Sequence, residues 1–96
     1  MNRSETLEEG KNEMFTWSNS LTLENNQITY LAHTFVHHNN LEIEHWIKTI
    51  DAKENDLYES IKKFLKSIND NKIEKLKIFL DKKNIKYEEK IWDTYE

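Results

Sequence analysis

Histidine and glutamate side chains gather in one short stretch of the chain, and this stretch is the clearest concentration of groups able to bind a metal. All four histidines lie between positions 33 and 45, with Glu42 and Glu44 among them. If the stretch is helical, Glu42 and His45 lie one turn apart, as do His33 and His37, a spacing found in carboxylate-rich metal centres of helical bundles. This interpretation predicts a metal site formed by His33, His37, Glu42 and His45.

The ligand set for such a site is incomplete. A di-iron bundle needs two Glu-x-x-His pairs and two further glutamates on four helices, and the chain has one such pair. A structural zinc site needs four ligands, and the chain has no cysteine. We therefore expect no metal and no cofactor, and keep a small metal-binding helical bundle as an alternative.

Catalytic chemistry of other kinds finds little support. Gly10 is the only glycine, so the chain cannot form a glycine-rich loop that binds phosphate, and its serines lack the context of an activated nucleophile. We expect that the protein is not an enzyme.

Lysine is concentrated in the second half of the chain. Residues 62–90 contain ten lysines and five acidic residues, which makes weak nucleic-acid binding a further alternative. Arg3 is the only arginine, however, and Phe64 and Phe79 fall on apolar faces of predicted helices. A solvated helix face explains the lysines better, and we regard nucleic acid as an unlikely partner.

Asparagine takes the place of glycine and proline at the predicted turns. The pair Asn25-Asn26 separates two segments of alternating polarity, and asparagine tolerates the left-handed backbone of a two-residue hairpin turn. This turn pairs Leu23 with Ile28 and Leu21 with Tyr30, which gives one apolar face and one polar face.

A second turn at 39–40 predicts pairs of Val36 with Ile43 and of Ala32 with Ile47 on the same apolar face. On the opposite face it predicts three further pairs: His37 with Glu42, Phe35 with Glu44, and His33 with Trp46. With a bend at 18–20, residues 14–48 form an antiparallel meander of about four strands. The same residues also fit helical spacing, so an all-α bundle is the alternative.

Two amphipathic helices are predicted after this meander, at about 53–68 and 72–83, and both pack on one face of the sheet. Asn84 is expected to end the second helix in a left-handed conformation. A short last strand at 85–87 and an apolar clamp formed by Ile91 and Trp92 complete the prediction.

The predicted architecture is therefore a single α+β domain over residues 1–96, in which residues 1–12 form a flexible or poorly packed segment. Hydrophobic residues make up 36% of the chain and charged residues 33%, a composition that is ordinary for a small globular domain. The chain contains no cysteine, no apolar leader and no apolar run of membrane-spanning length. These features predict a cytoplasmic protein with no membrane partner.

The outer face of the predicted sheet is the best candidate for a binding surface, because aromatic side chains stand there within a polar rim. Its members are Leu31, His33, Phe35, His37, Glu42, Glu44 and Trp46. We expect a non-catalytic protein-binding module, such as an inhibitor, immunity protein, antitoxin or small regulator, with a homodimer as a further expectation. The composition, rich in lysine, asparagine and isoleucine, suggests an AT-rich genome, that of a bacterium or its mobile elements.

Overall fold

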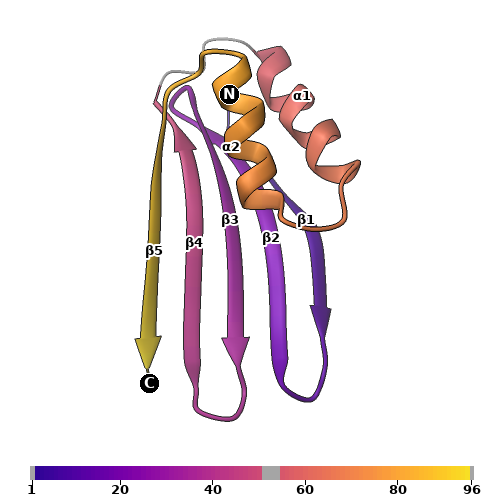
Figure 1. Ribbon diagram of the computed structural model, residues 1–96, viewed down its shortest axis with the longest axis vertical. Helices are drawn as coiled ribbons and strands as arrows, with labels where there is room; N and C mark the ends of the chain where they lie inside the picture. Colours follow the sequence, from indigo (N-terminus) through magenta and orange to yellow (C-terminus); the bar gives the residue numbers. More distant parts are fainter. Residues whose placement is uncertain (1, 51–54, 96) are drawn as a thin grey trace.

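Alternating polarity over residues 15–49 forms strands, and the helical period that follows it forms two helices (Figure 1). The computed structural model describes residues 2–50 and 55–95. Its elements follow in the order β1 (Arg3–Lys11), β2 (Phe15–Glu24), β3 (Gln27–Val36), β4 (Leu41–Thr49), α1 (Asn55–Lys66), α2 (Lys72–Lys82) and β5 (Tyr87–Tyr95). The strands form one antiparallel sheet in the order β1-β2-β3-β4-β5. The predicted α+β class is confirmed, and the all-α alternative is wrong.

The hairpin between β2 and β3 has the predicted register. Asn25 and Asn26 both have positive φ, 51° and 61°, as a tight hairpin turn of the type favoured by the strand twist requires. Leu23 therefore pairs with Ile28, and Leu21 pairs with Tyr30. The two asparagines fix which side chains of these strands face the core.

The hairpin between β3 and β4 has a longer turn than predicted. Its turn comprises residues 37–40, so Val36 pairs with Leu41 and not with Ile43. Only Asn40 adopts a positive φ here, 54°, and the Asn39 side chain accepts a hydrogen bond from the amide of Leu41 at 3.3 Å. The predicted pairs are displaced by two residues, and a displacement by two leaves every side chain on its predicted face.

Residues 14–48 form three strands and not four. The predicted bend at 18–20 is wrong, because β2 runs without interruption and Ser20 pairs with Thr6 on one side and Leu31 on the other. The additional strands of the sheet come from both ends of the chain.

The first of these is β1, in the segment that the sequence predicted to be flexible or poorly packed. Glu5 accepts hydrogen bonds from Tyr58 at 2.8 Å and Lys62 at 2.7 Å, both on α1. The Lys62 hydrogen bond, followed by that of Tyr58, lowers the pKa of Glu5. Arg3 stacks on the Tyr58 ring at 4.3 Å and pairs with Glu59. The charged side chains of Arg3 and Glu5 therefore attach β1 to α1.

The second is β5, which is longer than the predicted strand at 85–87. It pairs along its length with β4, and its residues Ile91 and Trp92 are 61% and 46% exposed. Neighbouring residues of a strand point to opposite faces, so these two side chains cannot close over one core. The predicted C-terminal clamp is wrong.

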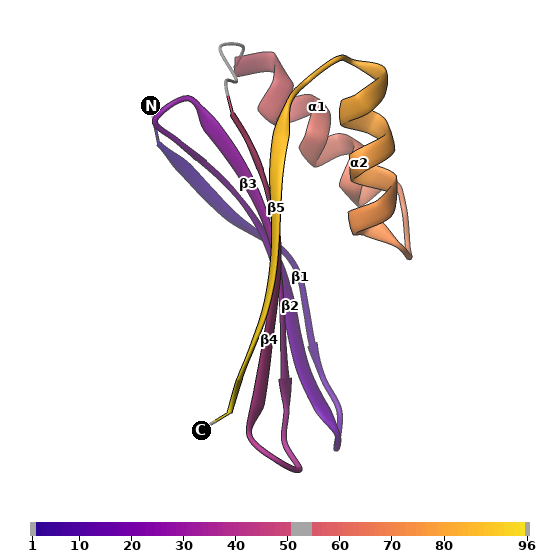
Figure 2. The same ribbon diagram turned by 60° about the vertical axis from the view of Figure 1, so that its left-hand side comes forward.

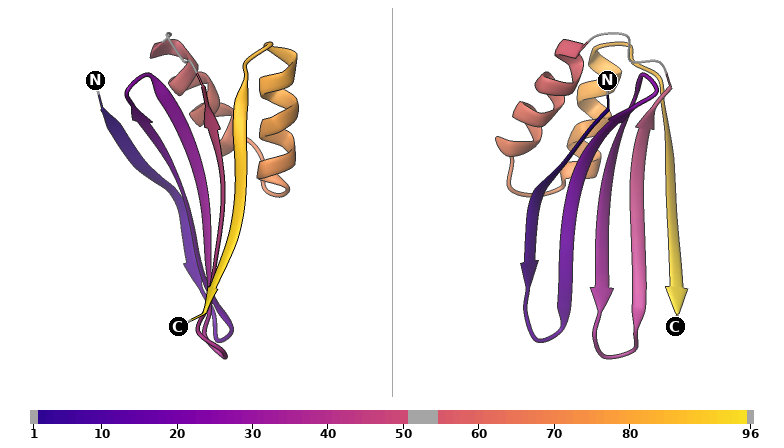
Figure 3. Two further views of the ribbon diagram at one scale, coloured as in Figure 1. Left: turned by 90° about the vertical axis from the view of Figure 1, so that its left-hand side faces the viewer. Right: turned by 180° about the vertical axis from the view of Figure 1, so that it is seen from behind.

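Both helices lie on one face of the sheet, as predicted, and enclose the core against it (Figure 3). The core residues are Leu21, Leu23, Ile28, Tyr30, Ile47, Leu57, Tyr58, Ile61, Leu65, Leu76 and Leu80. Residues 53 and 54 of the first predicted helix lie outside the described residues. Asn84 ends α2 in a left-handed conformation, as predicted, with φ 59°. Its backbone amide donates to the carbonyl oxygen of Asp81, and the amide of Ile85 donates to the carbonyl oxygen of Leu80.

The helices cover only part of this face, and the sheet extends well beyond them (Figures 1 and 2). The molecule measures 41 Å along its longest axis, whereas a helix of 12 residues, such as α1, is about 18 Å long. We call the part of the sheet beyond the helices, toward the turns at 12–14 and 37–40, the distal half. In the distal half no described element covers either face.

Candidate functional site

Six of the seven predicted site residues lie together on the outer face, which is the sheet face opposite the helices. They form three neighbouring cross-strand pairs of β3 and β4: Leu31 with Trp46, His33 with Glu44, and Phe35 with Glu42. All six side chains are partly exposed. No described element covers this face (Figure 3).

His37 is the exception, because it lies in the turn after β3. Its Nε2 is 2.6 Å from the Thr16 hydroxyl, and its Nδ1 is 3.2 Å from the carbonyl oxygen of Glu13. Its ring centroid lies 5.7 Å from that of Phe35. His37 therefore connects two neighbouring turns and stands at the margin of the outer face.

Trp92 of β5 also lies on the outer face, although the sequence predicted it to be part of a C-terminal clamp. Its ring meets Trp46 edge to face, with centroids 6.4 Å apart and an interplanar angle of 87°. The ammonium groups of Lys48 and Lys90 lie 5.9 Å and 5.7 Å from the Trp46 ring. We call Trp46, Trp92, Lys48 and Lys90 the tryptophan cluster. The run Glu88-Glu89-Lys90-Ile91-Trp92 does not alternate in polarity, so the sequence offered no periodic signal for this strand.

Acidic groups stand beside the tryptophan cluster on the same face. Glu44 and then Glu42 lie between Trp46 and the distal end of β4. The Glu42 carboxylate lies 3.7 Å from His33 Nε2. The outer face thus presents partly exposed aromatic rings among charges of both signs, with Lys48 and Lys90 beside Trp46, Glu44 opposite Trp92 and Glu88 opposite Lys48. This composition is typical of surfaces that bind other proteins reversibly.

The alternative metal site is wrong in its geometry. His45 points to the helix side of the sheet, where its Nε2 lies 2.6 Å from a carboxylate oxygen of Glu89. His33 and Glu42 lie on the outer face and His37 lies in the turn, so the strand conformation separates the four ligands. Within residues 2–50 and 55–95, no three His, Asp or Glu side chains are grouped so as to hold a metal ion.

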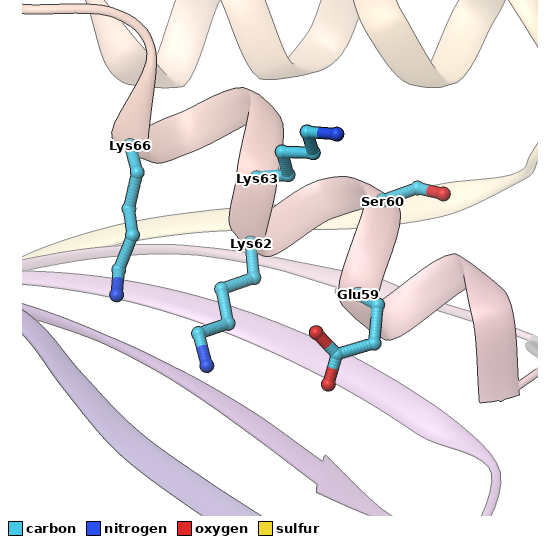
Figure 4. A pocket seen from close by; sticks show the side chains of 5 residues that line it. All are labelled: Glu59, Ser60, Lys62, Lys63 and Lys66. Carbon is cyan, nitrogen blue, oxygen red and sulfur yellow. The ribbon is translucent and has the colours of Figure 1, made fainter.

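The lysines of α1 and α2 do not converge on a common site. Lys62 and Lys72 bind the β1 carboxylates of Glu5 and Glu8, at 2.7 Å and 3.0 Å. In the shallow depression beside α1, Lys62 points toward the strands while Lys63 extends the other way (Figure 4). Lysines that are paired with carboxylates, or that point in different directions, do not form a continuous positive stripe along a phosphate backbone.

Asn19 of β2 carries a buried polar atom without a partner. The residue is 8% exposed, and its Oδ1 accepts no hydrogen bond from the described residues. Because an unsatisfied buried acceptor costs about 1–3 kcal/mol, we expect Asn19→Val to raise the free energy of unfolding by about 1 kcal/mol or more, measured by urea denaturation. Asn19→Asp should lower it, since it buries a charge. A loss of stability in Asn19→Val would mean that a buried water satisfies Oδ1.

Comparisons with protein-family models, with characterised proteins and with solved structures find no match for this chain. Neither α1 nor α2 is long and apolar enough to cross a membrane. The class that fold and surface define is a small α+β protein with an open sheet face.

Proposed function

We propose that this chain is a non-catalytic protein-binding module that recognises a partner protein through the outer face of β3, β4 and β5. The observation that carries the proposal is the edge-to-face pair of Trp46 and Trp92 on a sheet face that no described element covers. Tryptophan is strongly enriched among the residues that dominate the energy of protein interfaces. Two tryptophans in contact form a natural centre for such an interface.

The charges around the tryptophan cluster support a reversible complex. Lys48 and Lys90 lie beside the Trp46 ring, Glu44 pairs across the strands with Trp92, and Glu88 pairs with Lys48. A partner whose charges complement this mixed pattern associates in one orientation and at a higher rate. The module then acts by occupying and blocking its partner, as an inhibitor, immunity protein, antitoxin or regulator does. The lack of cysteine fits action in the cytoplasm.

The test begins with capture of the partner from the native host on the tagged full chain, followed by calorimetry with the purified partner. We expect Trp46→Ala and Trp92→Ala each to weaken binding at least 30-fold, because residues of this kind contribute about 2 kcal/mol or more. The matched control is Ile78→Ala, which removes an apolar side chain that is 54% exposed on α2.

Circular dichroism must show that both tryptophan variants remain folded. Unchanged affinity in both folded variants would contradict the proposed site, and equal losses in all three variants would point to a different surface.

A further inference from the structure

The helix side of the distal half is a second uncovered surface, and it differs in composition from the outer face. Two rows of paired residues cross the sheet there: Gly10, Trp17, Thr34, Ile43 and Asp93 in one row, and Phe15, Val36 and Leu41 in the next. Ile91 borders them from the row nearer the helices and is 61% exposed. We call these nine residues the distal apolar patch.

The patch carries a single charged side chain. Asp93 lies on the edge strand β5, at the rim of the patch, where solvent screens it. The Trp17 ring extends the patch over β1, because it lies so close to Gly10 that a Cβ there would approach it to 2.2 Å. A surface that is apolar and almost free of charge resembles the interfaces of homodimers more than those of transient complexes.

We infer that the distal apolar patch is the interface of a homodimer, in which two copies of this chain pack their distal halves face to face. The charge pattern supports a second copy as the occupant. An isologous interface places the same patch on both sides, so a patch with lysines or several carboxylates would repel itself. This patch contains neither, although the chain as a whole has a net charge of −4.

The shape of the molecule fits the same occupant. A helix is about 10 Å across, and packed sheets lie about 10 Å apart. The helices therefore rise above the uncovered distal half by about the spacing of two packed sheets, so that a second sheet fits beside them (Figure 2). With the twofold axis perpendicular to the strands, the helices of the two copies lie at opposite ends and do not collide.

The available area is sufficient for a dimer of modest affinity. The molecule is 41 Å long and 24 Å wide, and a helix of α1's length covers about 18 Å of the longer dimension. The uncovered face then measures about 20 Å by 24 Å, or about 1,000 Å² for both copies together, close to the lower limit for a specific interface. We expect dissociation in the micromolar range.

Sedimentation velocity on the full chain from about 1 to 300 μM tests the inference. The wild type is expected to change from monomer to dimer within this range. Ile43→Lys, at the centre of the patch, and Ile91→Lys, at its border, should each raise the dissociation constant at least 10-fold. Trp92→Lys is the matched control, since it is the neighbour of Ile91 on the opposite face and should leave the dimer unchanged.

A wild type that stays monomeric at 300 μM would overturn the inference. So would a dimer that only Trp92→Lys dissociates, because the interface would then be the outer face. Loss of partner binding in Ile43→Lys together with a monomeric wild type would assign the patch to the partner protein, and would likewise overturn the homodimer. The partner-binding test on Trp46 is independent of these outcomes.

Discussion

Replacing Ile47 by alanine is expected to lower the free energy of unfolding by about 3–4 kcal/mol, whereas the same change at Ile43 should cost about 1 kcal/mol. Both isoleucines lie on β4 and face the helix side of the sheet. Ile47 is 1% exposed beneath the helices, whereas Ile43 lies in the distal half and is only partly buried. The difference arises because only Ile47→Ala leaves a cavity in a closed core.

Urea denaturation followed by tryptophan fluorescence measures both losses. The measurement belongs at about 1 μM, below the expected dimer dissociation constant, and is repeated in the Ile91→Lys background to exclude a contribution from self-association. Since a domain of this size is stable by about 5–10 kcal/mol, Ile47→Ala alone should remove a large fraction of the total. Equal losses at the two positions would mean that the distal half is as well enclosed as the core.

The sequence determines which face of β2 and β3 is apolar, because the alternation and the asparagine turn act locally. Asn25 and Asn26 set the register, and Leu21 and Tyr30 then fall under the helices. The β3–β4 turn was predicted two residues too short, yet six of the seven outer-face residues were assigned correctly; the longer turn takes up the seventh, His37. Side chains alternate with a period of two, so an error of two residues changes partners and preserves faces.

The edge strands could not be predicted in the same way, because their inward residues are specified by distant partners. In β1, Glu5 faces the helix side only because Tyr58 and Lys62 are there to bind it. A local pattern of apolar residues is missing from this strand. Trp92 was misassigned for a related reason: its contact with Trp46 joins segments separated by two helices.

The uncovered distal half could have been deduced from lengths alone. Ten strand residues, as in β2, extend about 33 Å, and twelve helical residues, as in α1, extend about 18 Å. Helices of this length cannot cover strands of that length. Phe15, Val36 and Ile43 therefore belong to a surface, although their spacing is that of core residues.

Raising the pH from 10 to 12 is expected to unfold the protein. Tyr30 and Tyr58 are 2% and 0% exposed, and burial raises the pKa of each to about 12, helped at Tyr30 by the charge of Glu8 and at Tyr58 by the hydrogen bond to Glu5. In the unfolded chain a tyrosine has a pKa of about 10. Between these values the folded state keeps protons that the unfolded state releases, so stability is complete below pH 10 and falls as the pH rises.

The size of this effect is comparable to the whole stability of the domain. Each tyrosine contributes a slope of about 1.4 kcal/mol per pH unit, and two tyrosines over two units give about 5 kcal/mol. Absorbance at 295 nm reports tyrosine ionisation, and circular dichroism reports unfolding in the same titration. The two signals should change together above pH 10, because the buried phenols ionise when the fold opens.

Phenylalanine variants separate this mechanism from general alkaline damage. Tyr58→Phe loses the hydrogen bond to Glu5 and should cost about 1 kcal/mol at pH 7, but it should halve the decline in stability between pH 10 and 12. Tyr30→Phe should halve the decline as well, and the double variant should abolish most of it. An unchanged decline in the double variant would show that a change other than tyrosine ionisation destabilises the fold at high pH.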